Sequence, residues 1–238
     1  MGTFFIADLH LSVARPEMVT AFLGFLEGRA SRADALYILG DLFDQWLGDD
    51  DETVPHPVIV KALARLTMAG VPVSVMHGNH DFLLAEQFAR QTGCQLLPDQ
   101  TTVDVYGTRV LIMHGDTLCI DDREYQALRT EVRDADNQAR FLALPLAERA
   151  AKAALLRATS KEQTQLKPLA IMDVNQAAVV RVMREHGVLH LIHGHTHRPA
   201  IHSLAIDGRQ ATRIVLGDWY ERANSLLWDE AGYRVLTS

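Results

Sequence analysis

Cysteine is scarce in this sequence, in which only Cys94 and Cys119 occur among 238 residues. Two cysteines are too few for a disulfide framework or for a zinc site built from cysteine. We therefore expect both thiols to be reduced and the protein to belong to a cytosolic compartment.

Long hydrophobic runs are also missing. No apolar stretch approaches the roughly 18 residues that a helix needs to cross a bilayer. The N-terminus, MGTFFIADLH, reaches an acid at position 8 without the basic segment that opens a signal peptide. The sequence thus predicts a soluble protein and leaves open a role at a membrane surface.

Basic residues are fewer than acidic ones. The chain has 23 Lys and Arg and 30 Asp and Glu, which gives a formal net charge of −7. A chain this acidic is a poor candidate for non-specific binding to nucleic acid, and we expect no such partner. The 48% of hydrophobic and 22% of charged residues are ordinary for a globular protein. The length fits one large α/β domain or a domain with one sizeable insertion.

Five strand-like apolar runs end directly in clusters of polar residues. The runs cover 3–7, 35–39, 71–76, 110–113 and 188–192. Helical patterns over 16–29, 57–69 and 82–92 separate the first runs. This alternation predicts an α/β fold around a buried sheet, whose ligand sites lie beyond the carboxyl ends of the strands, where all five clusters fall.

The C-terminal part has a different pattern. Runs at 201–206 and 211–216 flank Asp207-Gly208, which is a hairpin signal, and a second turn at 230–232 separates two further short runs. A second, more antiparallel layer is therefore expected. The complete prediction is a sandwich of two β-sheets flanked by helices.

Residues 121–170 interrupt the pattern with helical segments only, split near Pro145 and ended near Pro168. We interpret them as a helical lid inserted into a core formed by 1–120 and 171–238. Between 138 and 170, six basic and two acidic residues give a local charge of +4, beside an apolar group at 141–146. A solvated amphipathic hairpin is one interpretation. The other is a lid whose cations meet an anionic substrate and whose apolar face meets a lipid-like one.

The polar clusters supply seven side chains that can bind metal ions: Asp8, His10, Asp41, Asn79, His114, His195 and His197. In Asp8-x-His10 and His195-x-His197, residues two apart on an extended segment point the same way. Seven ligands exceed one tetrahedral site. With one carboxylate shared they suit two ions, the usual arrangement for phosphoryl hydrolysis. A single histidine after a strand is often a core or turn residue, but five such clusters in order favour a metal centre.

The remaining histidines receive other interpretations. We expect His77, His190 and His193 to be supporting residues that face backbone or core. His186 fits the C-terminal end of a helix, where the helix dipole favours a cation. The other two, His56 and His202, are expected at the surface.

The five clusters together resemble the sequence blocks of the calcineurin-like metallophosphoesterase superfamily: Asp8-x-His10, Gly40-Asp41, Gly78-Asn79-His80-Asp81, His114-Gly115-Asp116 and Gly194-His195-Thr196-His197. The resemblance implies that Asp41 bridges two metal ions. It also implies one site completed by Asp8, His10 and His197, and a second completed by Asn79, His114 and His195.

A narrower resemblance covers nearly the whole chain and is to the manganese-dependent UDP-2,3-diacylglucosamine diphosphatase family of lipid A biosynthesis. The segments that carry it are ADLHL at 7–11, GDLFDQWLGDD at 40–50, MHGN at 76–79, MHGDTLC at 113–119, HGHTHRP at 193–199 and IVLGDW at 214–219. It implies two Mn²⁺ ions, a helical lid after the His114 block and a hydroxide between the ions that attacks the α-phosphorus. The implied products are UMP and 2,3-diacylglucosamine 1-phosphate (lipid X). The implied location is cytoplasmic, peripheral on the cytoplasmic face of the inner membrane, whereas the oligomeric state is not indicated.

The resemblance also assigns roles in the lid. Residues that match the family's binding site for the glucosamine phosphate head are Asp122, Tyr125, Arg157, Ser160, Thr164 and Lys167, together with Asn79, His80 and His195 of the core. Arg and Lys suit phosphate, while hydroxyls and a carboxylate suit sugar or amide groups. Candidates for an acyl-chain chamber are Trp46, Phe82, Leu83, Phe141 and Met172. Ordinary core packing is the alternative for them.

One position departs from the narrower family, which usually has Arg where this chain has His80. In the wider superfamily the matching His touches the scissile phosphate. The resemblance therefore implies that His80 stabilises phosphate or acts as a general acid, with Asp41 and His195 as the other catalytic residues.

Two rival functions use the same fold. A phosphodiesterase or pyrophosphatase for a soluble nucleotide would have the same metal residues but no need of an apolar, basic insertion. A non-catalytic binding module would normally have lost ligands, and none of the seven is missing here.

Overall fold

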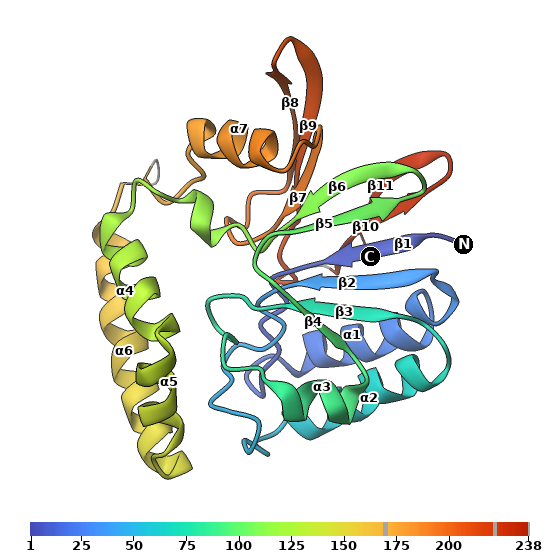
Figure 1. The fold of residues 1–238 in the computed structure, drawn as a ribbon. Helices are drawn as coiled ribbons and strands as arrows, with labels where there is room; N and C mark the ends of the chain where they lie inside the picture. The colour runs from blue at the N-terminus through green and yellow to red at the C-terminus, as the bar shows by residue number, and fades with distance from the viewer. Residues whose placement is uncertain (169–170, 221–222, 238) are drawn as a thin grey trace.

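Two β-sheets pack face to face in the structure, a computed structural model that describes residues 1–168, 171–220 and 223–237, with the backbone alone for 161–166 (Figure 1). The first sheet has the strand order β11-β10-β1-β2-β3-β4. Its strands are β1 (Thr3–Ile6), β2 (Ala35–Leu39), β3 (Val73–Met76), β4 (Gln95–Leu97), β10 (Asn224–Asp229) and β11 (Gly232–Thr237).

The second sheet has the order β5-β6-β7-β9-β8. Its strands are β5 (Thr101–Val105), β6 (Thr108–Ile112), β7 (His190–His193), β8 (Ala200–Ile206) and β9 (Arg209–Val215). The predicted sandwich of two sheets is confirmed, and so is the hairpin at Asp207-Gly208, which joins β8 to β9.

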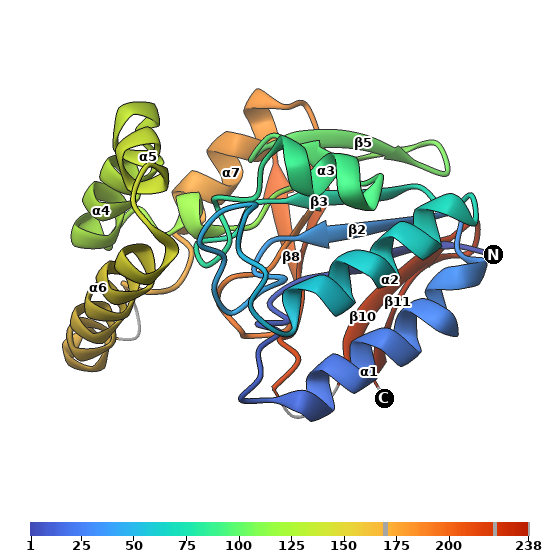
Figure 2. The same cartoon turned by 90° about the horizontal axis from the view of Figure 1, so that it is seen from below.

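Helices cover both outer faces of the sandwich. Three of them, α1 (Pro16–Glu27), α2 (His56–Met68) and α3 (Glu86–Thr92), lie along the first sheet (Figure 2). The second sheet is covered by α7 (Gln176–Glu185). Side chains alternate along β1, so that Phe4 and Ile6 pack toward the helices while Phe5 packs between the sheets. Three apolar layers result, one under each set of helices and one between the sheets.

Parallel pairing determines where the polar clusters meet. The strands β1, β2 and β3 are mutually parallel, and β6 runs parallel to β7. Their carboxyl ends therefore open at one edge of each sheet. The loops that leave these ends bring together residues far apart in the sequence, such as Asp8 and His195.

The segment 121–170 contains helices and no strand among its described residues. These helices are α4 (Arg123–Arg133), α5 (Ala135–Leu142) and α6 (Leu146–Leu166), and they stand beside the sandwich, beyond the carboxyl ends of β1 to β3 (Figure 1). The predicted break near Pro145 is confirmed. A further break at Asp134, whose side chain caps α5 by accepting from the Asn137 N–H, was not predicted.

Two strands were missed and one helix was predicted too long. Edge strand β5 is Thr-rich and half exposed, so it lacks the continuous apolar run that marks a buried strand, and β4 has only three residues. Helix α3 begins at Glu86 rather than 82, because Leu83 and Leu84 pack into the core from an irregular segment. Among the helices that the structure describes, none is both long and apolar enough to span a membrane.

Candidate dimetal centre

The seven predicted ligand side chains come together at the carboxyl ends of the strands, as the sequence predicted. Asp8 and His10 follow β1, Asp41 follows β2, Asn79 follows β3, and the three others follow β6 and β7. Three overlapping groups have donor atoms within 4.8 Å of one another: Asp8, His10 and His197; His10, Asp41 and His80; Asp8, Asp41 and His114. Most of these side chains are buried, with Asp8 fully inaccessible.

Asp41 lies between the other donors. Its Oδ2 is 3.7 Å from His10 Nε2 and 3.6 Å from His114 Nε2. Asp8 Oδ1 is 3.6 Å from His197 Nε2. These separations are too long for good hydrogen bonds but suit donor atoms that share an ion. The carboxylate of Asp41 is therefore placed to be common to two sites.

In the second group of donors, His114 and His195 both face the side-chain amide oxygen of Asn79. Asn79 Oδ1 is 3.0 Å from His114 Nε2 and 2.9 Å from His195 Nδ1. On the other side, His10 Nε2 and His197 Nε2 face each other at 3.3 Å, and the buried His10 Nδ1 has no hydrogen-bond partner among the described residues. Imidazole nitrogens turned toward one another and toward carboxylates form the donor set of a divalent transition-metal site. The residues fit two such ions.

The backbone that presents these ligands is strained. Asp8, His10, Asp41, His195 and His197 all have positive φ, between 47° and 68°. The expectation that the Asp-x-His and His-x-His pairs lie on extended segments is therefore wrong, because β1 ends at Ile6 and β7 at His193, before the pairs begin. Left-handed backbone at non-glycine residues costs of the order of 1–3 kcal/mol each and is concentrated at functional sites.

A buried carboxylate holds the Asp41 loop. Asp81 accepts hydrogen bonds from the backbone N–H groups of Leu42 and Gly78, both at 2.8 Å, and of Asp41 and Phe43, both at 3.3 Å. Asp41 Oδ1 in turn accepts from the His80 N–H at 2.8 Å. Asp81 belongs to a recognised sequence block, but its structural role was not predicted.

Charges in the cluster are set by burial and by neighbouring groups. Burial, reinforced by the neighbouring His80, lowers the pKa of His10 to about 2, and burial lowers the pKa of His195 to about 4. Burial alone would raise the pKa of Asp8, but hydrogen bonding and the charges of the histidines lower it to about 2. At neutral pH His10 and His195 are therefore neutral imidazoles and Asp8 is an ionised carboxylate, which are the forms that bind metal ions.

His197 differs, because Asp218 lies 2.9 Å from its Nδ1. Despite burial, Asp218 and Asp8 raise the pKa of His197 to about 10. A carboxylate that holds the outer nitrogen of a metal-binding histidine fixes its ring orientation and makes it a stronger ligand. Asp218 stands in the quoted IVLGDW segment, yet nothing in that pattern indicated its partner.

Helix α6 reaches the cluster through Arg157. Its guanidinium lies 2.9 Å from Asp44 Oδ2 and 2.8 Å from His80 Nδ1. His80 Nδ1 is also 2.8 Å from the Asp44 carbonyl oxygen. Arg157 and His80, both predicted to bind phosphate, are thus brought together, and Asp44 is a neighbour that was not predicted.

Helix α4 contributes Tyr125, whose hydroxyl donates to Asp116 at 2.9 Å and whose ring centre lies 5.7 Å from that of His195. Asp116 also accepts from Arg129 at 2.6 Å, and Arg129 pairs with Asp99. The lid helix is therefore tied to the loop after β6.

The remaining predicted head-group residues lie at or near the ends of α4 and α6. Lys167 Nζ donates to both oxygens of Asp122, at 2.7 and 2.9 Å. These two residues line an open cavity of about 460 Å³, between residues 121–124 and Lys167, Pro168 and Ile171. Ser160 is half buried on α6, whereas the side chain of Thr164 lies outside the described residues.

The five acyl-chain candidates are not equally accessible. Trp46 and Leu83 are buried in the core under α2 and α3, and Phe82 and Phe141 pack against that core while half exposed. Met172 is half buried, and its carbonyl oxygen accepts from the Cys119 thiol. Phe82, Phe141 and Met172 therefore keep accessible apolar surface.

Several other histidines confirm or correct the predictions. His77 Nε2 contacts the Leu84 carbonyl and His193 Nδ1 that of Gly194, as expected for supporting residues. His186 ends α7 as predicted, and His202 is exposed. His56, expected at the surface, is instead buried between the rings of Phe43 and Trp46, because its Nδ1 lies 3.3 Å from the Asp51 carbonyl oxygen, which satisfies the polar nitrogen.

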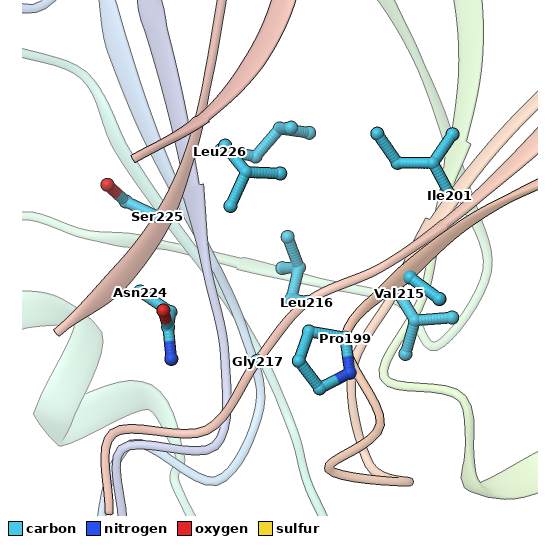
Figure 3. Close-up of a pocket in the computed structure, with 10 residues that line it drawn as sticks. Pro199, Ile201, Val215, Leu216, Gly217, Asn224, Ser225 and Leu226 are labelled. Carbon is cyan, nitrogen blue, oxygen red and sulfur yellow. The ribbon is translucent and has the colours of Figure 1, made fainter. Parts of the chain in front are cut away.

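A second cavity, of about 130 Å³, lies between the edges of the two sheets (Figure 3). Its walls are largely apolar, with Ile201, Val215, Leu216 and Leu226 among them. None of the predicted site residues lines it. The candidate chemistry is therefore confined to the loops at the carboxyl ends of the strands.

Comparisons with known proteins agree with this geometry. A family model described as calcineurin-like phosphoesterase matches residues 1–199. Curated proteins named UDP-2,3-diacylglucosamine hydrolase, from Escherichia coli O157:H7 (strain EC4115 / EHEC) and E. coli (strain K12 / DH10B), are 54% identical over 220 residues, which is 92% of this chain and 92% of each relative. A solved structure described as a novel archaeal phosphodiesterase matches all of both chains with a TM-score of 0.53 and 13% identity, a likeness of fold alone. The matched residues include all five ligand-bearing clusters, and the chain belongs to the calcineurin-like phosphoesterase family.

Proposed function

We propose that this protein hydrolyses the pyrophosphate bond of UDP-2,3-diacylglucosamine and releases UMP and 2,3-diacylglucosamine 1-phosphate. The observation that carries the proposal is the contact of Arg157, a cation of the inserted helices, with His80 and Asp44 beside the ligand cluster. A hydrolase for small soluble phosphoesters has no need of such an insertion. The curated relatives named for this substrate support the same conclusion.

In this proposal two Mn²⁺ ions bind at the centre. Asp8, His10 and His197 would hold one ion, Asn79, His114 and His195 would hold the other, and Asp41 would be shared by both. Two such ions supply a hydroxide nucleophile at neutral pH and neutralise charge on the reacting phosphate. The nitrogen and oxygen donors suit Mn²⁺, and the family resemblance favours that metal over Fe or Co.

The protein's own residues orient the substrate. His80 lies beside Asp41 and would donate an N–H to a phosphate oxygen, either to stabilise charge on the α-phosphate or, as a general acid, to protonate the oxygen that leaves with the phosphate of the lipid half. His195, at the other side of Asn79, contacts the same phosphate. Arg157 binds the phosphate of the lipid half, which holds the reacting phosphorus over the centre before chemistry begins.

Residues 121–170 act as the lid in this proposal, over a catalytic core of 1–120 and 171–238. Asp122, Tyr125, Ser160, Thr164 and Lys167 would recognise the glucosamine phosphate head. Accessible apolar surface on Phe82, Phe141 and Met172 would receive the acyl chains, with the buried Trp46 and Leu83 forming the wall behind them.

Replacing Arg157 by alanine tests the role of the lid. We expect Arg157→Ala to raise KM for UDP-2,3-diacylglucosamine about 10- to 100-fold, the loss typical of one hydrogen-bonded charge. Hydrolysis of a small artificial phosphodiester, which has no lipid phosphate, should remain largely intact. Arg140→Ala is the matched control, since Arg140 is an exposed lid arginine whose partner is Asn137. Equal losses on both substrates would contradict the lid role.

Substrate class is tested most directly by comparing three compounds with the Mn²⁺-loaded protein. We expect rapid turnover of UDP-2,3-diacylglucosamine and little turnover of a UDP-sugar without acyl chains or of a cyclic nucleotide. The measurement is release of UMP or of the hydrolysed nucleotide. Preferred turnover of either soluble compound would favour the nucleotide hydrolase instead.

The substrate's acyl chains require contact with the inner-membrane surface, and α6 supplies a candidate face. Leu155 and Leu156 are 70% and 42% exposed, and the exposed Lys152 lies one turn before Leu156 on the same helix. Exposed leucines beside a lysine favour the surface of an anionic bilayer.

We expect the double variant Leu155→Glu/Leu156→Glu to bind anionic phospholipid vesicles at least about tenfold more weakly in a sedimentation assay. Met68→Glu is the control, because Met68 is 79% exposed but lies at the end of α2, away from the lid. If the double variant and the control bound vesicles as the unmodified protein does, peripheral attachment through α6 would be wrong.

A further inference from the structure

Two tyrosines flank different parts of the ligand cluster. Tyr125, from α4, packs on His195. Tyr220, from the segment between β9 and β10, packs on the other part, with its ring centre 6.0 Å from that of His10 and 5.7 Å from that of His197. Lys167 lies on the side of Tyr125, where it pairs with Asp122, whereas Arg157 reaches the cluster at His80, whose ring centre lies 4.5 Å from that of His10. The side of Tyr220 has no assigned ligand.

Tyr220 offers an aromatic surface at the rim of the centre. Its side chain is 52% exposed, although it contacts two buried or half-buried histidines. The guanidinium carbon of Arg15 lies 4.2 Å from the ring centre. This contact holds one part of the ring in place and leaves the rest open to a ligand.

Arg15 brings positive charge to the same place. It donates to the His10 carbonyl at 2.8 Å, so its position is tied to the ligand loop after β1. No carboxylate of the described residues forms an ion pair with it, and its buried NH1 lacks a hydrogen-bond partner among them. A cation without an acidic partner beside a phosphate-binding centre favours an anionic ligand.

We propose that Tyr220 and Arg15 form the nucleotide subsite, in which the pyrimidine ring stacks on Tyr220 and Arg15 attracts the charge of the attached phosphate. The inference rests on the proposed function, which divides the substrate into a lipid half bound by the inserted helices and a nucleotide half that still needs a binding surface. Aromatic side chains stack on any base, so the subsite explains binding of the nucleotide half without a hydrogen-bond code.

The roles of the two residues differ. Tyr220 contacts the base itself. Arg15 is a positioning residue for the Tyr220 ring and also acts on phosphate through its charge. A ligand with phosphate but no base should therefore respond to a change at Arg15 and not to one at Tyr220.

Calorimetric titration of the Mn²⁺-loaded protein with UMP and with ribose 5-phosphate tests the subsite. We expect Tyr220→Leu to weaken UMP binding about tenfold, the loss typical of one base stack, and to leave ribose 5-phosphate binding unchanged. Tyr220→Phe keeps the ring and should bind both ligands as the unmodified protein does. Arg15→Gln should weaken both ligands several-fold. Metal content and melting temperature, measured for each variant, exclude loss of the centre as the cause.

Unchanged UMP affinity in Tyr220→Leu, or equal loss for UMP and ribose 5-phosphate, would overturn the proposal. Failure of the proposed function would give a different experimental result. In that case the unmodified protein would not hydrolyse UDP-2,3-diacylglucosamine, while the selective effect of Tyr220→Leu on UMP would persist.

Discussion

Asp41→Ala is expected to reduce hydrolysis at least about 1000-fold, both for UDP-2,3-diacylglucosamine and for a small phosphodiester. The reason is that Asp41 Oδ2 faces His10 and His114 together, one donor from each predicted site. Loss of a shared ligand removes several kcal/mol of transition-state stabilisation, and each 1.36 kcal/mol is worth a factor of ten in rate.

The melting temperature measured with and without Mn²⁺ is a second test of the role of Asp41. Binding at one hundred times Kd stabilises a folded protein by about 2.7 kcal/mol, so Mn²⁺ should raise the melting temperature of the unmodified protein clearly. The rise should be much smaller in Asp41→Ala. Asp136→Ala is the control, because Asp136 is an exposed carboxylate on α5. Retention of full phosphodiesterase activity by Asp41→Ala would remove the bridging role altogether.

Chelation should have the same effect without any substitution. Excess EDTA is expected to abolish activity, and added Mn²⁺ to restore it, because the deprotonated donors are already grouped in the folded chain. Activity that survived exhaustive chelation, with metal content checked by atomic emission, would contradict a metal-dependent reaction.

The ligand cluster could be predicted from the sequence because it depends on topology rather than on detail. Apolar runs that end in Asp, Asn or His identify the strand ends, and parallel pairing of β1 with β2 and of β2 with β3 brings those ends to one edge. The same logic applies to β6 and β7. The strand order therefore brings these residues to one edge of the sheets, independently of the backbone conformation of each loop.

The local backbone itself could not be predicted. Asp8 and His10 point into one centre through left-handed backbone and not through extended alternation. Nothing in residue type identifies an aspartate or histidine with positive φ, since only the surrounding contacts stabilise it. Asp81, which collects four backbone N–H groups of the Asp41 and Gly78 loops, supplies such contacts.

The contacts between the inserted helices and the sandwich could not be predicted from the sequence either. Arg149 is one of the six basic residues counted between 138 and 170, yet it is 2% exposed and donates to the Leu47 carbonyl at 2.6 Å and to Asp50. A composition of basic residues indicates charge but not partners. For that reason the sequence could indicate inserted helices but not which arginine packs against the sandwich and which reaches the centre.

Close approach of two loops makes Gly78→Ala the most disruptive small substitution near the centre. A Cβ at Gly78 would lie 2.0 Å from Asp41 Oδ1 and 2.3 Å from the Asp41 nitrogen. No real Cβ contact is that short, so Asp41 must move. A displacement of about 1 Å at a reacting centre can cost about 100-fold in rate, and overpacking costs about 1–3 kcal/mol of stability. We therefore expect Gly78→Ala to lose about two orders of magnitude in activity and to bind Mn²⁺ more weakly.

Gly24→Ala provides the matched control for this expected loss. Gly24 lies inside α1, and a Cβ there would meet no atom within 4 Å. Alanine is favoured over glycine in a helix by about 0.5–1 kcal/mol, so this variant should melt higher and keep full activity. The two glycine-to-alanine changes are chemically identical and differ only in what the added methyl group meets. Normal Mn²⁺ stoichiometry and activity in Gly78→Ala would mean that the Asp41 loop tolerates displacement, and that its tight packing is not what holds the bridging carboxylate in position.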